Sequence, residues 1–155
     1  VKTIFITKKT GYKIAPTERD LQASGESGSK ITFPIKAVGN MHYLSVEIAG
    51  ESISYLIDSG SSYISITTAM EKRMKDMGVL RDSDYQGEVD LELADNSIKR
   101  LKKIIIPVVK IGSQSITNVE AVVSDGSLLL GRSVMNKFKS WNIDNSSNQL
   151  VVEKY

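Results

Sequence analysis

The chain has 155 residues, of which 41% are hydrophobic and 25% charged, enough for one packed domain and too few for two substantial ones. Its 20 basic and 18 acidic residues leave a net charge of +2, which gives no basic footprint for nucleic acid. Cysteine is absent, which excludes disulfides, thiol nucleophiles and cysteine-based zinc sites, and a serine triad would have to use the single histidine, His42. We expect no metal and no cofactor.

The first thirty residues differ in composition from the rest. The apolar run Ile4–Ile6 lies between lysines and suits an edge strand or a clipped hairpin, whereas Ala15–Lys30 has no periodicity and is typical of a linker or surface loop. We predict that residues 1–30 form an N-terminal strand and linker or tether, and that the compact domain spans residues 31–155. Because the chain begins at Val1 rather than Met, we expect a processed or trimmed product, so any leader or anchor would lie outside this sequence.

Short strands and turns dominate from Ile31 onward, which predicts an all-β fold. Apolar and polar side chains alternate over residues 31–35 and 43–48, and a tight turn at Gly50 leads into a further strand over 53–57.

One helix is predicted before the C-terminal third of the chain. It begins near Thr68, and Glu71 lies three residues later, where it could close a capping box. Met70, Met74 and Met77 then fall on one helical face, and we expect them in the core.

The second half of the chain also reads as strands and turns. Apolar and acidic side chains alternate over residues 89–93, residues 94–97 supply turn chemistry, and the chain resumes at Ile98, which predicts a β-hairpin. Residues 127–131 suit a buried strand that ends in glycine, and residues 141–152 suit a closing hairpin.

One carboxylate, Asp58, stands at the end of the apolar run Tyr55–Ile57 and is followed at once by small residues. A polar group at the end of a buried strand must find hydrogen bonds or another charge to offset its desolvation. Functional sites place carboxylates in such positions, so Asp58 is the candidate catalytic residue. The structural alternative is a buried capping acid.

An internal repeat relates two parts of the chain. The segment Val46–Ser54 recurs 63 residues later as Val109–Thr117, and each copy reads as strand, tight turn, strand. Each copy is followed by an apolar strand and a glycine-bearing loop, at residues 58–60 in one case and 130–132 in the other. The repeat predicts two related halves around a local pseudo-two-fold axis.

From residue 31 to residue 153 this order of elements resembles the retropepsins, the single-domain aspartic peptidases of retroviruses and their bacterial relatives. Asp58-Ser59-Gly60 is similar to the family's Asp-Thr/Ser-Gly, Leu129-Leu130-Gly131-Arg132 is similar to its apolar-apolar-Gly-Arg segment, and the 89–106 hairpin looks like its flap. The resemblance implies a retropepsin-like closed β-barrel, the acid protease fold, with one or two short helices and a flap hairpin.

The resemblance also implies an aspartic endopeptidase that hydrolyses peptide bonds in extended polypeptide substrates. Two carboxylates near contact share one proton, so the charged member activates a water while the protonated member polarises the peptide carbonyl. The chain carries a single Asp-Ser/Thr-Gly and has no equivalent acid beside Leu130-Gly131, so the resemblance implies a homodimer in which each subunit contributes Asp58.

Further site residues follow from the same resemblance. Ser59 would hydrogen-bond across the dimer, and Gly60 would allow a close backbone approach or a positive φ. The remaining candidates are the small residues of the pocket floor, the flap tip and the second loop: Ser61 and Ser62; Ala94, Asp95, Asn96 and Ser97; and Leu130, Gly131 and Arg132. The flap-tip residues would otherwise form an ordinary solvent turn, and Ser59 an ordinary turn serine.

One departure from the retroviral pattern affects the dimer. Ser62 stands where those enzymes usually carry an acid that pairs with the arginine matching Arg132. Arg132 could instead meet Asp125 or Asp144, or be exposed. A separate basic cluster near the predicted flap, Lys99, Arg100, Lys102 and Lys103, is either a solvated face or a surface that attracts acidic substrate segments or an anionic membrane.

Two alternatives to an active peptidase remain. One is a catalytically inactive retropepsin-like binding or dimerisation module, and the other is a β-rich extracytoplasmic adaptor. The localisation is unknown from these residues, and family habit alone favours an exported, periplasmic or membrane-tethered bacterial protein.

Overall fold

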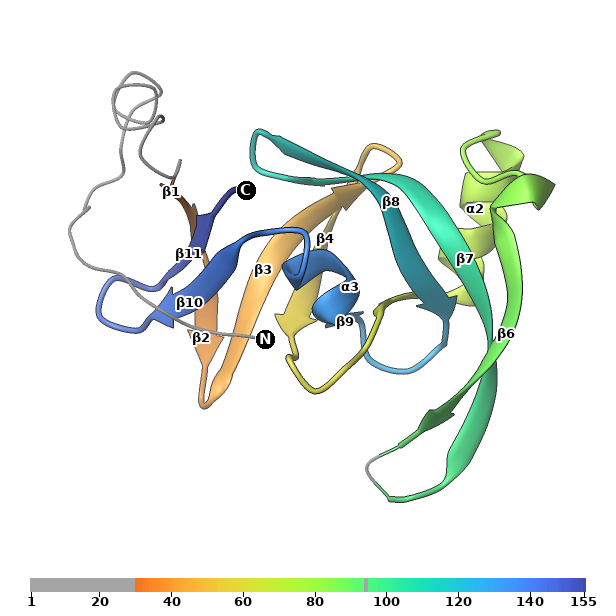
Figure 1. Cartoon of the computed structure of the whole chain (residues 1–155), viewed down its shortest axis with the longest axis horizontal. Helices are drawn as coiled ribbons and strands as arrows, with labels where there is room; N and C mark the ends of the chain where they lie inside the picture. Colours follow the sequence, from red (N-terminus) through yellow and green to blue (C-terminus); the bar gives the residue numbers. More distant parts are fainter. Residues whose placement is uncertain (1–29, 94) are drawn as a thin grey trace. The chain divides into compact units, whose positions relative to one another are not determined.

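The computed structural model describes residues 30–93 and 95–155, and these form two compact units. The first comprises residues 30–44 with 135–155, and the second comprises Ser45–Val134. The predicted N-terminal strand and linker lie outside the described residues. Strands dominate both units, as predicted, and the described helices are α2 (Thr68–Asp76), α3 (Arg132–Met135) and the short 3₁₀ helix η1 (Asp82–Asp84) (Figure 1). None of the helices in the described residues has the length and hydrophobicity to cross a membrane.

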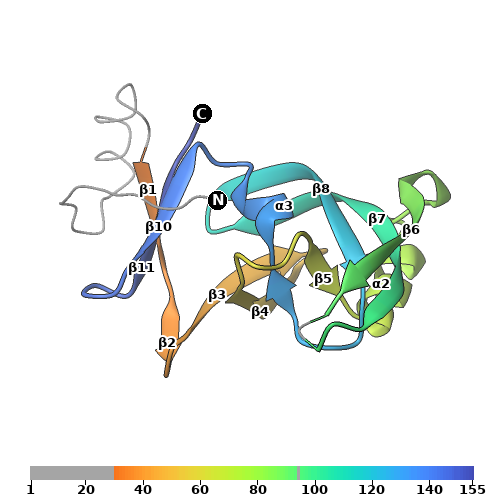
Figure 2. The ribbon, with the colours of Figure 1, turned by 60° about the horizontal axis from the view of Figure 1, so that its bottom comes forward.

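The first unit is built on a three-stranded antiparallel sheet. Its strands lie in the order β1 (Lys30–Pro34), β11 (Gln149–Glu153), β10 (Ser140–Asp144), so the predicted closing hairpin is β10–β11 (Figure 2). Alternation along the strands places one row of apolar residues on a common face, and its buried members include Ile31, Phe33, Trp141, Leu150 and Val152. A second hairpin in this unit joins β2 (Lys36–Val38) to the start of β3 (Met41–Ile48).

The second unit is a larger sheet. Its strand order is β5-β8-β7-β3-β4-β9, and β6 pairs with β7. The bounds of these strands are β4 (Glu51–Ile57), β5 (Ile64–Ile66), β6 (Tyr85–Glu92), β7 (Ile98–Ile111), β8 (Gln114–Val123) and β9 (Leu129–Leu130). The fully buried side chains of this unit come from both halves of the chain and include Val46, Ile48, Tyr55, Ile64, Ile66, Ile104, Ile106, Val109, Val119 and Leu130. Apolar burial from both halves therefore forms a shared core.

The predicted closed barrel is not formed in the described residues, because the sheet of the second unit ends at β5 and β9. Where closure would need backbone pairing between these two strands, a serine side chain makes the connection. The Ser65 hydroxyl accepts from the Leu129 backbone N–H at 2.9 Å and donates to the Ser127 carbonyl at 3.1 Å. One buried hydroxyl thus replaces a ladder between strands that are only three and two residues long.

The sequence repeat corresponds to two hairpins with tight turns, β3–β4 and β7–β8. Each hairpin is followed by a loop, a short strand and a helix, β5 and α2 in the first half and β9 and α3 in the second. The pairing between the halves is reciprocal, because β4 runs parallel to β9 and β5 runs parallel to β8. In each half, the second strand of the hairpin therefore pairs with the short strand of the other half.

The N-cap residue of helix α2 lies one position before the residue that the sequence pattern predicted. Thr67 is the N-cap, and its hydroxyl accepts from the Met70 backbone N–H at 3.1 Å. The Glu71 carboxylate therefore closes no capping box with Thr68 and is bound elsewhere. Met74 is buried as expected, but Met77 is 52% exposed because it is the C-cap residue, where the helix ends.

Candidate active site

Asp58 follows directly after β4, and its backbone N–H donates to the Leu130 carbonyl at 3.1 Å. Its side chain is half-buried. The Gly60 backbone N–H donates to Asp58 Oδ1 at 2.9 Å, and the Ser61 N–H donates to the Asp58 carbonyl at 3.1 Å. The loop of residues 58–63, which we name the Asp58 loop, thus turns back on the carboxylate and orients it through a backbone donor.

Gly60 serves close approach. A Cβ at this position would lie 3.2 Å from Asp58 Oδ1, and Gly60 lies outside the positive-φ region. The sequence predicted either a close backbone approach or a positive φ for this glycine, and the structure shows the close approach. A side chain here would press on the carboxylate that the loop orients.

Gly131 lies against the backbone of the Asp58 loop. A Cβ on Gly131 would lie 2.5 Å from the Tyr63 carbonyl oxygen and 2.6 Å from the Ser61 carbonyl oxygen, closer than real Cβ atoms approach. The adjacent Leu130 is fully buried and pairs with Ile57, the last residue of β4. The second predicted loop is therefore packed against the first.

Arg132 binds the Asp58 loop with its side chain and its backbone. Nη1 donates to the Ser59 carbonyl at 3.0 Å, Nη2 donates to Ser62 Oγ at 3.1 Å, and the backbone N–H donates to the Ser61 carbonyl at 2.8 Å. Ser62 thus keeps the arginine contact that an acid makes in the retroviral pattern, as a hydrogen bond rather than an ion pair. The expected alternative partners are engaged elsewhere, because Asp125 binds Thr68 and Asp144 binds Ser146.

Three of the predicted small residues thus have defined contacts. Ser61 Oγ donates to the Tyr63 carbonyl at 2.9 Å, and Ser62 receives Arg132. The Ser59 side chain is exposed, and its backbone carbonyl is the acceptor for Arg132. Sequence reasoning missed Ser133, whose hydroxyl accepts from the Ile64 N–H at 2.9 Å and joins the start of α3 to the start of β5.

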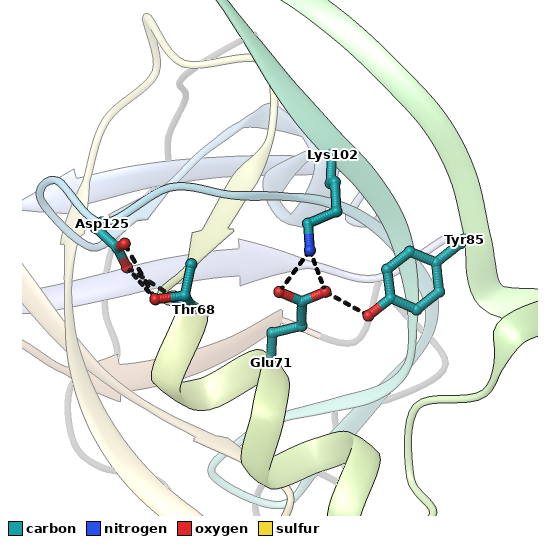
Figure 3. Close-up of polar contacts among 5 residues, drawn as sticks. All are labelled: Thr68, Glu71, Tyr85, Lys102 and Asp125. Atoms are coloured by element: carbon teal, nitrogen blue, oxygen red, sulfur yellow. Dashed lines mark hydrogen bonds and ion pairs between the residues drawn. The ribbon is translucent and has the colours of Figure 1, made fainter.

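The second half supplies an acid in the loop that follows β8, and this acid caps a helix. The Asp125 carboxylate accepts from the Thr68 backbone N–H at 2.8 Å and from the Thr68 hydroxyl (Figure 3). These hydrogen bonds lower the pKa of Asp125, and the charge of Lys99 lowers it further. The carboxylate is therefore held ionised at the N-terminus of α2, where negative charge is favoured.

The predicted flap corresponds to the hairpin β6–β7, and the described residues of its tip are 93 and 95–97. Ala94 lies outside the described residues. The Ser97 N–H and hydroxyl both donate to Asp95 Oδ1, at 2.9 and 2.6 Å, and Asn96 has a φ of +69°. Leu93 and Ile98 flank the turn with 41% and 64% of their surface exposed, so the tip combines a polar turn with two apolar side chains.

The basic cluster on β7 is largely ion-paired. Arg100 binds Asp90 of the neighbouring strand at 2.8 Å, Lys102 binds Glu71 at 2.8 Å, and Lys103 lies 3.3 Å from Glu120. These pairs favour the solvated-face interpretation of the cluster over a free anion-binding surface.

A buried acid on α2 was not recognised from the sequence. Glu71 is 6% exposed, and its carboxylate accepts from Lys102 Nζ at 2.8 and 3.0 Å and from the Tyr85 hydroxyl (Figure 3). The available signal was its position three residues before Met74, which places it on the apolar face of the helix. Among the described residues, no group of three acidic or histidine side chains could hold a metal ion.

Comparison with known proteins identifies a family and a similar fold. Residues 44–137 match the family described as "gag-polyprotein putative aspartyl protease". The structure is similar to the crystal structure of a retropepsin-like aspartic protease from Rickettsia conorii, with a TM-score of 0.57 and 22% identity over 81% of this chain and 90% of that one. No curated protein matches the sequence significantly. The chain belongs to the retropepsin-like aspartic protease family.

Proposed function

We propose that the chain is an aspartic endopeptidase that acts as a homodimer, with Asp58 of each subunit forming one catalytic pair. The observation that carries the proposal is the half-buried Asp58 carboxylate, which a backbone N–H of Gly60 orients at the end of β4. The family match supports peptide hydrolysis as the reaction class.

The second carboxylate is assigned to a second copy of the chain, since the loop acid of the second half is already in use. Asp125 binds the first residue of α2 through both of its oxygens. Two Asp58 groups in contact would share one proton, so one would activate the attacking water and the other would polarise the scissile carbonyl. The exposed Ser59 hydroxyl would then hydrogen-bond across the dimer.

The hairpin β6–β7 is proposed as the flap, and an extended substrate would pair with backbone beneath it. The apolar side chains at its tip, Leu93 and Ile98, would contact substrate or the partner's flap. Residues 31–155 would form the peptidase domain, and residues 1–30 would precede it as a strand and linker or tether.

The test is cleavage of a peptide library at acidic and neutral pH by the wild type, by Asp58→Asn and by Asp76→Asn. Asp76 is an exposed acid of α2 paired with Lys72, so its variant makes the same chemical change away from the site. We expect cleavage by the wild type and Asp76→Asn and its loss in Asp58→Asn, with a dimer mass in solution. Cleavage that survives in Asp58→Asn contradicts the mechanism, and a stable dimer with no turnover supports the inactive binding or dimerisation module instead.

A further inference from the structure

The hairpin β6–β7 is attached to helix α2 at its root through one buried carboxylate. Glu71 of α2 binds Tyr85, the first residue of β6, and Lys102 of β7, so a single side chain holds both strands of the hairpin (Figure 3). Lys75, one turn further along α2, lies 5.4 Å from the centre of the Tyr85 ring and adds a cation–π contact to the same strand. We name Glu71, Tyr85 and Lys102 the root clamp.

The energetics of the root clamp favour a fixed geometry. A carboxylate that is 6% exposed loses its hydration, and it remains charged only when partners replace the lost water. Burial alone would raise the pKa of Glu71, but hydrogen bonds from Lys102 and Tyr85 together with the charges of Lys102 and Lys75 lower it. The clamp is thus a charge-assisted contact that is costly to open, because opening it would leave a buried acid unpaired.

The neighbouring lysine of β7 secures the opposite face of the strand. Successive strand residues point to opposite faces, so Lys103 faces away from the clamp. Its ammonium lies 5.4 Å from the ring centre of Tyr63 in the Asp58 loop and 3.3 Å from Glu120 of β8. The root of β7 is therefore held on one face by α2 and on the other by the Asp58 loop.

A bulge lies within the clamped part of the hairpin, between the strand pair of Tyr85 with Ile104 and the pair of Glu88 with Lys102. The register between β6 and β7 shifts between Tyr85 and Glu88, and Gly87 within the shift has a φ of +83°. Bulges with a positive-φ glycine bend a strand and interrupt its ladder. Beyond the bulge, the Asp90–Arg100 ion pair joins the two hairpin strands to each other and not to α2.

We propose that Glu71 is a positioning residue, which binds Tyr85 on one side of the Gly87 bulge and Lys102 on the other and so fixes the root of the β6–β7 hairpin on α2. Glu71 does not touch substrate and acts through Tyr85 and Lys102. The proposal rests on the proposed peptidase function only for its kinetic consequence. The attachment itself is tested without any turnover.

The direct test is hydrogen exchange of the hairpin amides in Glu71→Gln, Tyr85→Phe and Lys102→Met, with Asp90→Asn as the matched control. Asp90→Asn removes an acid and an ion pair from the same hairpin but leaves the root clamp intact. We expect roughly tenfold faster exchange over residues 85–104 in the three clamp variants, with β3 and β4 unchanged, and no such increase at the root in the control. Unchanged exchange at residues 85–104 in folded clamp variants overturns the proposal.

Kinetics separate positioning from a general loss of fold. For an active wild type, we expect the clamp variants to raise KM by roughly fivefold or more while kcat changes less, because a loosely held hairpin binds substrate less well but leaves the catalytic pair in place. Lys102→Arg keeps the cation and should restore wild-type exchange and KM. A failure of Lys102→Arg to rescue, in a folded protein, counts against the clamp.

Absent cleavage by the wild type would contradict the peptidase function, and the exchange experiment would still decide the clamp. If Glu71→Gln does not fold, Tyr85→Phe and Lys102→Met decide the result.

Discussion

The two loops beside Asp58 can pack together because residue 131 is glycine and has no side chain. A Cβ there would collide with the backbone carbonyls of Ser61 and Tyr63. Because these are backbone atoms, they cannot move aside as the end of a flexible side chain could. We predict that Gly131→Ala destabilises the protein by about 1–3 kcal/mol, the usual cost of overpacking, and lowers any activity by displacing the Asp58 loop. Chemical denaturation of the purified variant measures the change.

The matched control is Gly126→Ala in the loop before β9. Its Cβ would lie 3.8 Å from Ser124 Oγ, an ordinary contact, so stability should stay within about 0.5 kcal/mol of the wild type. Equal destabilisation of the two variants would show that the close approach at Gly131 is not what limits this position.

The Ser62–Arg132 contact predicts how a substitution at Ser62 changes the stability of the protein. Arg132 already reaches Ser62 Oγ at 3.1 Å, so Ser62→Asp should convert this hydrogen bond into an ion pair without rebuilding the loop. We expect a gain of about 0.2–1 kcal/mol in the free energy of unfolding at low salt. The gain should shrink at high salt, because ions screen exposed pairs.

Ser62→Asn serves as the control, since it changes size and polarity without adding charge. Thermal denaturation of both variants at two salt concentrations gives the comparison. An equal and salt-independent gain in Ser62→Asn would remove the ion pair as the cause.

At the scale of elements, α2 connects parts of the second unit that lie far apart in sequence. Its first residue, Thr68, binds Asp125 of the loop before β9, and Glu71 one turn later binds the hairpin root. In return, the backbone N–H groups of Arg132 and Ser133 at the start of α3 donate to the carbonyls of Ser61 and Ser62. Each half therefore holds the beginning of the other half's helix with its own loop.

The Glu71 contact predicts how stability depends on pH. The pKa of Glu71 in the folded protein lies below its ordinary value of 4.5, so the ionised carboxylate stabilises the fold above the unfolded-state pKa. This stabilisation should be lost as the pH falls through the lowered folded-state pKa. The wild type should therefore exceed Glu71→Gln in stability at neutral pH, and the difference should shrink in acid.

Urea unfolding of the wild type and Glu71→Gln across this pH range measures the difference. Asp76→Asn, which removes an exposed ion pair on the same helix, should change stability little at any pH. A difference between wild type and Glu71→Gln that stays constant from neutral pH into acid would contradict the assigned role of the charge.

Local patterns in the sequence predicted the strands, the hairpins and the place of Asp58, because alternation and turn chemistry act over a few residues. The root clamp could not be predicted in this way, since its three residues come from three elements and only folding brings them together. Thr67 and Thr68 are adjacent and both suit an N-cap, so the sequence pattern wrongly predicted Thr68 where Thr67 is the N-cap. The closed barrel was expected from resemblance, whereas Ser65 joins the ends of the sheet through its hydroxyl.

For the whole molecule, a catalytic pair shared between two copies predicts dominant inhibition by an inactive chain. When wild type and Asp58→Asn are mixed in equal amounts and exchange subunits, about half of the wild-type chains should enter mixed dimers, so cleavage per wild-type chain should fall to about half. An active site within one chain predicts no loss. Mixing with Asp76→Asn in place of Asp58→Asn provides the control for dilution and crowding.

The reciprocal pairing of β4 with β9 and of β5 with β8 also has a consequence for synthesis on the ribosome. Neither parallel ladder can form until the second half is synthesised, because Leu56 pairs with Leu129 and Ile64 pairs with Ala121. Such distant pairings carry a large loop-closure cost and slow the search for the native topology. The nascent first half therefore leaves the ribosome with unpaired strand edges, which can pair with other chains until the second half is synthesised.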